Sequence, residues 1–527
     1  MRALFATTLR LGDALSQHVL LCAAALLLGV MVALPLAVWA SRSRAVAQVS
    51  LGIAGLIQTI PALALLALFF PVLLALRSVF GAGLPALGFL PALLALSLYA
   101  VLPILRNTVT ALVNMDPRVI EAADGVGMTG YQRLRLVEAP LAAPFVMAGI
   151  RTAAVWTIGA ATLATTIGQQ SLGDPIFAGL QTQNWELVLA GCIAAAALAL
   201  VADGLLAMVE RGFAMRRPML VFIGAGLALA GVAGAAVAMR DDGRDVAVVG
   251  AKNFSEQYIL ARLIGARLSA AGYKVEYREG LGSSVIHRAL TSGAIDVYVD
   301  YTGTILANEI GPGNMDDAGT APADLVEAIA RWERETTGTR LLGALGFENA
   351  YAFAMPKEVA RERGIAALDD LAPVASSLTI GGDLEFFERP EWKAVREAYG
   401  LQAANTRSFS PTFMYDALIA RNADVISAFS SDGRIAADDL LVLADPRGAL
   451  PAYDAVLLIA PDRAEDPRFV AALRPLIGAI NVEAMRRANY AVDRQQAKRT
   501  PQQAAQELAE ELAQKQAITT GGAPDAR

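Results

Sequence analysis

The chain has 527 residues, of which 55% are hydrophobic, and its mean hydropathy is +0.45. These values exclude an ordinary soluble protein of this length and predict membrane spans. The formal charge of −6 divides unevenly, with +4 on residues 1–217 and −10 on the remainder. A basic apolar part followed by an acidic polar part indicates a membrane domain joined to a domain on the far side, and nothing points to nucleic acid.

Six apolar runs are long enough to cross a bilayer as helices, whose backbone groups bond to one another in lipid. The first is long for a signal peptide and no small-residue cleavage site follows it, so an uncleaved span is expected. Arg151 and Asp203 fall inside the fourth and fifth runs, where we expect them near helix ends. The runs are 17–40, 51–76, 84–105, 141–168, 187–206 and 218–239.

Arginines indicate the orientation of these spans. The loops after the first, third and fifth spans carry several arginines, whereas 169–186 carries no basic residue. By the positive-inside rule the arginine-bearing loops are cytoplasmic, and the chain after residue 239 is extracytoplasmic. We therefore expect a multi-pass protein of the inner (cytoplasmic) membrane with a periplasmic C-terminal domain.

The cytoplasmic loop 106–140 resembles the EAA signature of binding-protein-dependent ABC permeases. That signature is Glu-Ala-Ala, three residues, Gly, nine residues, then Ile-x-Leu-Pro; here Val137 and Ala139 replace Ile and Leu. A short helix, a break at the glycine and a second helix that ends near Pro140 are expected. The alternative is an ordinary amphipathic connector. The resemblance implies that a separate nucleotide-binding subunit docks on the segment that carries Glu121, Ala122, Ala123, Gly127 and Pro140.

The sequence predicts no enzyme. It contains no Gly-x-x-x-x-Gly-Lys-Ser/Thr loop, so a separate ATPase must supply the energy. Cys22 and Cys192 lie in apolar runs, and His18 and His287 are isolated, so we predict no disulfide framework, metal site or cofactor. The five spans before Pro218 match the minimal core of this permease type, and the sixth is interpreted as a tether.

After 240–245 the pattern changes to alternating strands and helices. The βαβαβ order predicts an α/β domain with a mostly parallel sheet, where ligands bind at the carboxyl ends of strands. The length suffices for two lobes, with chain crossings expected near 346–354 and 450–457. The expected elements are a strand at 246–250, a helix at 255–271, a strand at 273–278, a helix at 283–292 and a strand at 295–301.

This second part resembles the glycine betaine/choline/carnitine-binding proteins of osmoprotectant importers over about 246–500. Six motifs in the family's order carry the resemblance: Lys252 to Gln257, Asp300 to Thr304, Gly346 to Tyr351, Glu385 to Pro390, Asp424 to Ile435, and Pro451 to Tyr453. The resemblance implies a two-lobed periplasmic-binding-protein fold of type II behind the multi-span α-helical permease fold. The expected domains are a permease at 1–217, a sixth span and linker at 218–245, a substrate-binding domain at 246–510 and a tail at 511–527.

By the same motifs, the resemblance implies an aromatic cage for a quaternary ammonium. Such a cation has no N–H group to donate, so aromatic faces bind it by cation–π attraction, about 0.5–2 kcal/mol per ring. Phe429 stands where family members often have tyrosine. The implied cage is Tyr301, Tyr351, Phe429 and Tyr453.

A ligand carboxylate would need fixed donors at the other end of the pocket. Arg389 offers a bidentate fork, and Lys252 and Thr304 are further candidates. Asn349 and Glu385 are expected to line or brace the pocket.

These features predict the permease and substrate-binding component of an ATP-driven importer for quaternary-amine osmoprotectants of the glycine betaine, choline and carnitine class. The expected partners are a separate ATPase subunit, the small ligand, the lipid bilayer and a second or paired permease. Two alternatives stay open. The cargo could be another amine or an amino-acid-like solute, or the chain could be a membrane-anchored ligand sensor that transports nothing.

Overall fold

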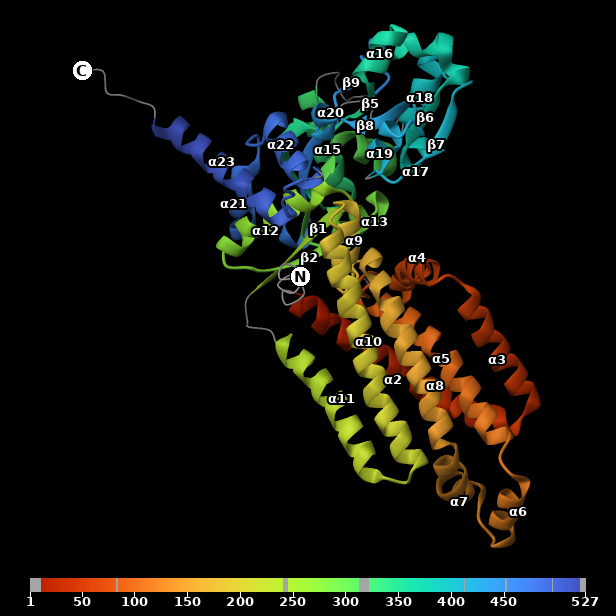
Figure 1. The fold of residues 1–527 in the computed structure, drawn as a ribbon. Helices are drawn as coiled ribbons and strands as arrows, with labels where there is room; N and C mark the ends of the chain where they lie inside the picture. The colour runs from red at the N-terminus through yellow and green to blue at the C-terminus, as the bar shows by residue number, and fades with distance from the viewer. Residues whose placement is uncertain are drawn as a thin grey trace. The chain divides into compact units, whose positions relative to one another are not determined.

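The computed structural model describes residues 11–81, 84–239, 245–311, 322–411, 413–450, 453–494 and 496–521. They form two compact units, one built from the apolar helices and the other from sheets and helices (Figure 1). The main division falls at residues 242–243, close to the expected start of the substrate-binding domain. Of the predicted linker 240–245, only Asp245 lies within the described residues.

In the described part of the chain, six helices are long and apolar enough to cross a membrane, which confirms the predicted number of spans. They include α2, α4, α5, α10 and α11, and the sixth joins α7 and α8 through a π-helical turn. The bounds are α2 (Gly12–Arg42), α3 (Arg44–Thr59), α4 (Ala62–Phe80), α5 (Phe89–Val113), α6 (Pro117–Gly125), α7 (Gly130–Arg133), η1 (Leu134–Glu138), α8 (Ala139–Ala161), η2 (Thr162–Ile167), α9 (Asp174–Gln181), α10 (Trp185–Ala214) and α11 (Pro218–Ala238).

The predicted second span, 51–76, is not one helix. The chain is extended at Ile60 and Pro61, so α3 ends at Thr59 and α4 begins at Ala62. Proline has no N–H group for the helix ladder and disfavours helical geometry at the preceding residue. The candidate span therefore lies further along the chain than expected, at Ala62–Phe80.

Small residues let α2 pack closely against α5. The buried face of α2 repeats every four residues at Ala25, Gly29, Ala33 and Ala37. A Cβ atom on Gly29 would lie 2.8 Å from the Cβ atom of Ala100 on α5. Close approach through small side chains is the usual basis of helix packing in lipid, where apolar burial between helices drives little. This stripe holds α2 against α5, the most enclosed of the spans.

The sequence suggested that Arg151 and Asp203 lie near helix ends, but the structure places both away from the ends. Arg151 is in the middle of α8, and its Nε and Nη2 atoms donate to the two carboxylate oxygens of Asp203 on α10, each at 2.9 Å. Its Nη1 atom donates to Glu210 at 2.6 Å. Pairing with opposite charges on a neighbouring helix is how ionisable groups are accommodated inside a membrane.

The second unit contains two five-stranded sheets, each forming one lobe. The strand orders are β2-β1-β3-β10-β4 and β7-β6-β8-β5-β9. The strands are β1 (Val246–Lys252), β2 (Lys274–Leu281), β3 (Val297–Tyr301), β4 (Arg340–Glu348), β5 (Tyr351–Pro356), β6 (Thr379–Gly382), β7 (Asn405–Ser408), β8 (Val425–Phe429), β9 (Leu440–Val442) and β10 (Asp454–Ile459).

Helices flank both sheets of the second unit (Figure 1). Their positions agree with the predicted strand–helix alternation between 246 and 301. The bounds are α12 (Ser255–Ala270), α13 (Ser283–Thr291), α14 (Thr302–Ile305), η3 (Leu306–Ile310), α15 (Pro322–Thr336), α16 (Lys357–Arg363), η4 (Leu368–Ser377), α17 (Leu384–Glu388), α18 (Pro390–Tyr399), α19 (Met414–Ile419), α20 (Arg434–Ala437), η5 (Pro461–Arg463), α21 (Pro467–Leu473), η6 (Arg474–Leu476), α22 (Val482–Asp493) and α23 (Pro501–Gly521).

The sheets are mixed rather than mostly parallel. Strand β1 runs parallel to β2 and β3, and β6 runs parallel to β7 and β8. The strands that enter or leave a lobe, β5 and β10, are antiparallel to their neighbours. The first crossing, Asn349–Ala350 between β4 and β5, lies within the predicted range. The second lies between β9 and β10, and Pro451 and Ala452 of it are outside the described residues.

Helix α23 continues to Gly521, into the predicted tail at 511–527. Ala504, Ala505, Leu508 and Leu512 form a buried stripe at helical spacing. The helix packs against α12 and α22, so it belongs to the folded second unit. Residues 522–527 lie outside the described residues.

His287 is not isolated, which corrects the prediction from sequence. Its Nε2 atom lies 2.8 Å from Glu333 and its Nδ1 atom lies 3.3 Å from Glu309. Burial opposes charging of His287, but the bonds to the two carboxylates outweigh it and raise its pKa to about 10. The side chain is therefore a protonated bridge between two helical segments of the first lobe.

This bridge predicts a pH-dependent stability. The pKa of His287 is raised on folding, so its stabilisation is complete below the unfolded pKa of about 6.5 and is lost as the pH rises towards about 10. We expect His287→Asn to lower the melting temperature most at pH 6. The difference in melting temperature between the variant and the unmodified protein should be smaller at pH 10. A difference that does not change with pH would contradict a charged His287.

Candidate functional site

A cavity of about 800 Å³ lies between the two lobes. Elements of both lobes position its side chains at their ends: Tyr301 closes β3, Phe429 closes β8, and Tyr351 opens β5. The structure brings all nine residues that the sequence proposed for ligand binding to the lining of this one cavity. They are Lys252, Tyr301, Thr304, Asn349, Tyr351, Glu385, Arg389, Phe429 and Tyr453.

Five rings form a continuous aromatic wall on this cavity. Neighbouring rings follow one another in the order Tyr301, Phe254, Phe429, Tyr351 and Tyr453, with centroids 6.2, 6.2, 5.1 and 5.5 Å apart. The rings of Phe254 and Phe429 are nearly parallel, at 4°, whereas those of Tyr351 and Tyr453 meet at 89°. Walls that meet at an angle suit a rounded trimethylammonium group, which needs π faces on several sides.

Phe254 is the member of the wall that sequence reasoning missed. It belongs to the motif Lys252 to Gln257, and it precedes α12 as an extended residue. Its partners Tyr301 and Phe429 come from two other motifs. An aromatic residue inside a family motif was the available signal.

Gly303 makes room for one end of the wall. A Cβ atom at this position would lie 2.6 Å from the ring of Tyr453, closer than side chains tolerate. The Tyr453 hydroxyl donates to the buried carboxylate of Glu391 on α18. Tyr453 is thus clamped between a glycine of the first lobe and a carboxylate of the second.

Arg389 is buried at the cavity, with 6% of its surface exposed. It precedes Pro390 and is extended, so it ends α17 and caps α18. Its Nη2 atom donates to Glu385 at 2.5 Å, and its Nη1 atom lies 3.6 Å from Glu391. Its Nε and Nη1 atoms make no hydrogen bond to any described residue. Buried donors of this kind are rare unless a ligand or water completes them.

Lys252 lines the cavity with its charge already balanced. Its ammonium group pairs with the buried carboxylate of Asp300. The same carboxylate accepts from the Tyr298 hydroxyl at 2.6 Å and from the backbone N–H of Tyr301 at 2.8 Å. Lys252 is therefore a weaker candidate for a ligand carboxylate than Arg389.

Burial sets the protonation of the titratable groups at the cavity. It raises the pKa of Tyr301, Tyr351 and Tyr453, so their rings stay neutral. Burial also raises the pKa of Asp383, and it outweighs the lowering effect of the hydrogen bond that the carboxylate accepts from the backbone N–H of Phe386. For Glu385 the effect of burial is outweighed by the positive charges of Arg389 and Lys252, and the pKa is lowered.

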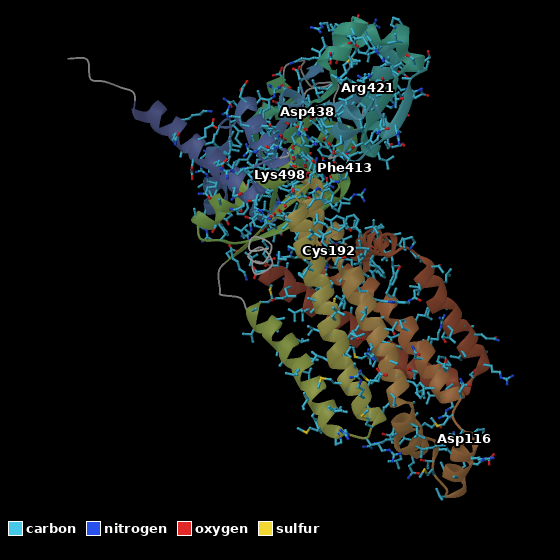
Figure 2. The ribbon with its side chains drawn as sticks, in the orientation of Figure 1. Asp116, Cys192, Phe413, Arg421, Asp438 and Lys498 are labelled. Carbon is cyan, nitrogen blue, oxygen red and sulfur yellow. The ribbon has the colours of Figure 1, made fainter. Side chains whose placement is uncertain are left out.

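The first unit carries a second candidate site, the loop between α5 and α8. Asp116, labelled in Figure 2, caps the first turn of α6. The chain turns at Gly127, whose φ of +79° favours glycine, and a capping box at Thr129 and Gln132 starts α7. The short helix α6 and the break at Gly127 agree with the prediction, but the second helix does not end near Pro140, because α7 continues through η1 into α8. Of the signature residues, Ala123 is buried and Glu121, Ala122, Gly127 and Pro140 are exposed.

An ion network joins this loop to the membrane helices. Glu138 is buried, and its two oxygens accept from Arg42 at the end of α2 and from Arg133 on α7, at 2.5 and 3.0 Å. Arg133 also donates to both oxygens of Asp124 on α6, at 2.6 and 2.8 Å. The two short helices are thus tied to each other and to α2. Large apolar side chains stay exposed on the loop, at Val126, Tyr131 and Leu136.

These two sites and the fold define the membrane component of a solute importer with its own receptor. Residues 25–215 match the family "Binding-protein-dependent transport system inner membrane component", and 246–511 match the "Substrate binding domain of ABC-type glycine betaine transport system". The chain belongs to this ABC-type glycine betaine transport family. It is a transporter subunit rather than an enzyme, and it is an inner-membrane protein with an extracytoplasmic binding domain.

Relatives match either the whole architecture or its membrane half. The chain is 30% identical over 484 residues to the ergothioneine transport permease/ergothioneine binding protein EgtU of Helicobacter pylori, covering 88% of this chain and 83% of that protein. It is 44% identical over 195 residues to the choline transport system permease protein OpuBB of Bacillus subtilis, covering 37% and 84%. It is 42% identical over 190 residues to the osmoprotectant import permease protein OsmW of Salmonella typhimurium, covering 36% and 85%.

Proposed function

We propose that this chain is the permease and receptor of an ATP-driven importer for small quaternary amines that carry a carboxylate, such as glycine betaine and carnitine. The observation that carries the proposal is one cavity in which the aromatic wall lies close to Arg389, whose Nε and Nη1 atoms make no hydrogen bond to a described residue. The guanidinium carbon is 5.7 Å from the ring centroid of Tyr351. A trimethylammonium group binds to aromatic faces, and a carboxylate binds to the arginine fork.

Phe429 offers the cleanest test of the aromatic wall, because it has no hydroxyl group to lose. Phe429→Leu removes a π face, so it should weaken glycine betaine and choline by about 0.5–2 kcal/mol, or roughly 2- to 30-fold. Phe429→Tyr keeps the face and should bind both ligands nearly as the unmodified protein does. Titration calorimetry measures both. Equal affinities for the leucine and tyrosine variants would contradict cation–π binding at this ring.

Tyr453 is less suitable for such a comparison. Its hydroxyl donates to the buried Glu391, so Tyr453→Phe would also leave a buried carboxylate without its donor. That loss alone costs about 1–3 kcal/mol. A weakened Tyr453→Phe variant would therefore not discriminate between the ring and the hydrogen bond.

A second candidate cargo is ergothioneine. It carries the trimethylammonium and carboxylate groups of a betaine and adds a thio-imidazole ring. Two observations favour it: the similarity to the ergothioneine transporter spans both halves of the chain, and the cavity of about 800 Å³ leaves room for the ring. Competition between ergothioneine and glycine betaine for the purified chain ranks the two. The tighter ligand is the better candidate for the cargo.

A separate ATPase subunit is part of the proposal. The chain has no P-loop sequence, so the purified chain should hydrolyse no ATP. Addition of the cognate ATPase subunit should give hydrolysis that glycine betaine stimulates. ATP hydrolysis by the purified chain itself, free of any contaminating ATPase, would contradict the proposal.

A further inference from the structure

Glu256 is a buried carboxylate that the ligand site described above does not use. It lies in the first turn of α12, inside the motif Lys252 to Gln257, and 3% of its surface is exposed. The cations near the cavity, Lys252 and Arg389, pair with other carboxylates. Burying a carboxylate is costly unless hydrogen bonds compensate, so its four donors define its role.

Those donors come from four different parts of the second unit. Oxygen Oε1 accepts from the Tyr301 hydroxyl at 2.7 Å and from the Asn349 side chain at 3.0 Å. Oxygen Oε2 accepts from the Ser431 hydroxyl at 2.6 Å and from the Asn489 side chain at 2.8 Å. Each oxygen therefore receives one hydroxyl and one amide group.

The positions of the donors connect the two lobes. Tyr301 ends β3 of the first lobe, and Asn349 stands at the first crossing between lobes. Ser431 follows β8 of the second lobe, next to Ser430, which exchanges hydrogen bonds with Ala350 of the same crossing, both at 2.9 Å. The carboxylate is thus the common acceptor where the aromatic wall meets the first crossing, Asn349–Ala350, which we call the hinge.

The first turn of α12 holds the ring of Tyr301 through two hydrogen bonds to its hydroxyl group. The Tyr301 hydroxyl donates to Glu256 and accepts from the Gln257 side chain at 3.0 Å. Gln257 also donates to the backbone carbonyl of Val299 at 3.0 Å. With both bonding directions of its hydroxyl occupied, Tyr301 is held in one orientation before any ligand arrives, which lowers the ordering cost of binding.

We propose that Glu256 is a positioning residue of the receptor, whose buried carboxylate holds Tyr301 in the aromatic wall and locks that wall to the hinge through Asn349 and Ser431. The part of this inference that concerns ligand affinity rests on the proposed function. The part that concerns the hinge does not, because it depends only on hydrogen bonds within the protein.

A glutamine at position 256 tests the carboxylate with little change of volume. Glutamine has one acceptor oxygen and one NH₂ group. The glutamine side chain can still accept hydrogen bonds from both Ser431 and Asn489 only if its NH₂ group faces Tyr301 and Asn349. The Tyr301 hydroxyl then loses its acceptor, since an NH₂ group cannot accept and Gln257, its other partner, also presents an NH₂ group.

Glu333 supplies a matched control in the same lobe. It too is buried, and it accepts from Thr339 at 2.5 Å and contacts His287 at 2.8 Å. It does not line the cavity. Glu333→Gln should therefore destabilise the protein without changing its affinity for ligand.

The experiment measures affinity and hydrogen exchange on the full chain in detergent or nanodiscs. We expect Glu256→Gln to weaken glycine betaine and choline alike, by about tenfold or more, the order expected when a buried hydrogen bond to a charged group is lost. Tyr301→Phe keeps the ring and removes the hydrogen bonds of the hydroxyl to Glu256 and Gln257. Because both changes break the bond between Tyr301 and Glu256, the double variant should lose less affinity than the sum of the two single losses.

Hydrogen exchange tests the hinge in the absence of ligand. Glu256→Gln should speed exchange in the segments around Tyr301 and Ser431 together, and Glu333→Gln should not. Unchanged exchange in both segments, or unchanged affinity in Glu256→Gln, would overturn the positioning role. If the unmodified chain binds no quaternary amine, the proposed function fails, and the exchange measurement still decides the role of Glu256.

Discussion

Arg389→Ala is expected to weaken glycine betaine and carnitine by about 1.5–3 kcal/mol, or roughly 10- to 150-fold, the range for a hydrogen bond to a charged group. Choline should lose much less, because it carries a hydroxyl in place of the carboxylate. The physical reason is that the Nε and Nη1 donors of Arg389 are buried at the cavity and make no hydrogen bond to a described residue. Titration calorimetry with the three ligands measures the difference.

Arg389→Lys is the matched variant for this test. Lysine keeps the positive charge but loses the planar fork, so it should restore only part of the affinity for glycine betaine. Equal losses for choline and glycine betaine in Arg389→Ala would mean that Arg389 supports the fold or lobe closure and does not read the carboxylate. The pair with Glu385 makes that alternative concrete, because Glu385 would lose its cationic partner in Arg389→Ala.

Gly127→Val should abolish transport while ligand binding by the receptor domain stays intact. Gly127 has a φ of +79°, which costs an L-residue about 1–2 kcal/mol and is worst for a β-branched side chain. The substitution therefore distorts the turn between α6 and α7, where we propose that the ATPase subunit docks. Glu121→Lys, which reverses a charge on the exposed face of α6, should have the same effect. Uptake into proteoliposomes and calorimetry measure the two properties.

Gly125 provides the control for this loop. It ends α6 at an exposed position, and a Cβ atom added there would have no neighbouring atom within 4 Å. Gly125→Ala should leave transport unchanged, since alanine suits a helix better than glycine. Transport at the normal rate in both Gly127→Val and Glu121→Lys would mean that the loop is only a connector between spans.

Much of the fold follows from local patterns in the sequence. Apolar runs predicted the number of spans, and spacing predicted the short helix before Gly127 but not that the helix after it continues past Pro140 into α8. The sequence contains Pro61, but it did not predict that a helix ends before it, because the apolar run continues across this proline. The mixed sheets could not be predicted from strand order alone, since the direction of β10 depends on where the chain returns from the second lobe.

The candidate site was predictable where one motif names one side chain. All nine residues carried over by motif lie on one cavity. The motifs could not predict which of their residues contact one another. Lys252 is balanced by Asp300, Phe254 stacks on Phe429, and Glu256 accepts from donors on four segments. These contacts join residues 45 to 233 positions apart.

The most direct test of the central claim is a calorimetric titration of the purified chain with glycine betaine, N,N-dimethylglycine and glycine. These ligands share the carboxylate and differ in the methyl groups on nitrogen. Binding to π faces favours the cation that has no N–H group to leave without a partner. We expect glycine betaine to bind at least about tenfold more tightly than dimethylglycine, and glycine to give no measurable binding. Equal affinity for glycine and glycine betaine, or no binding of any quaternary amine, would contradict the central claim.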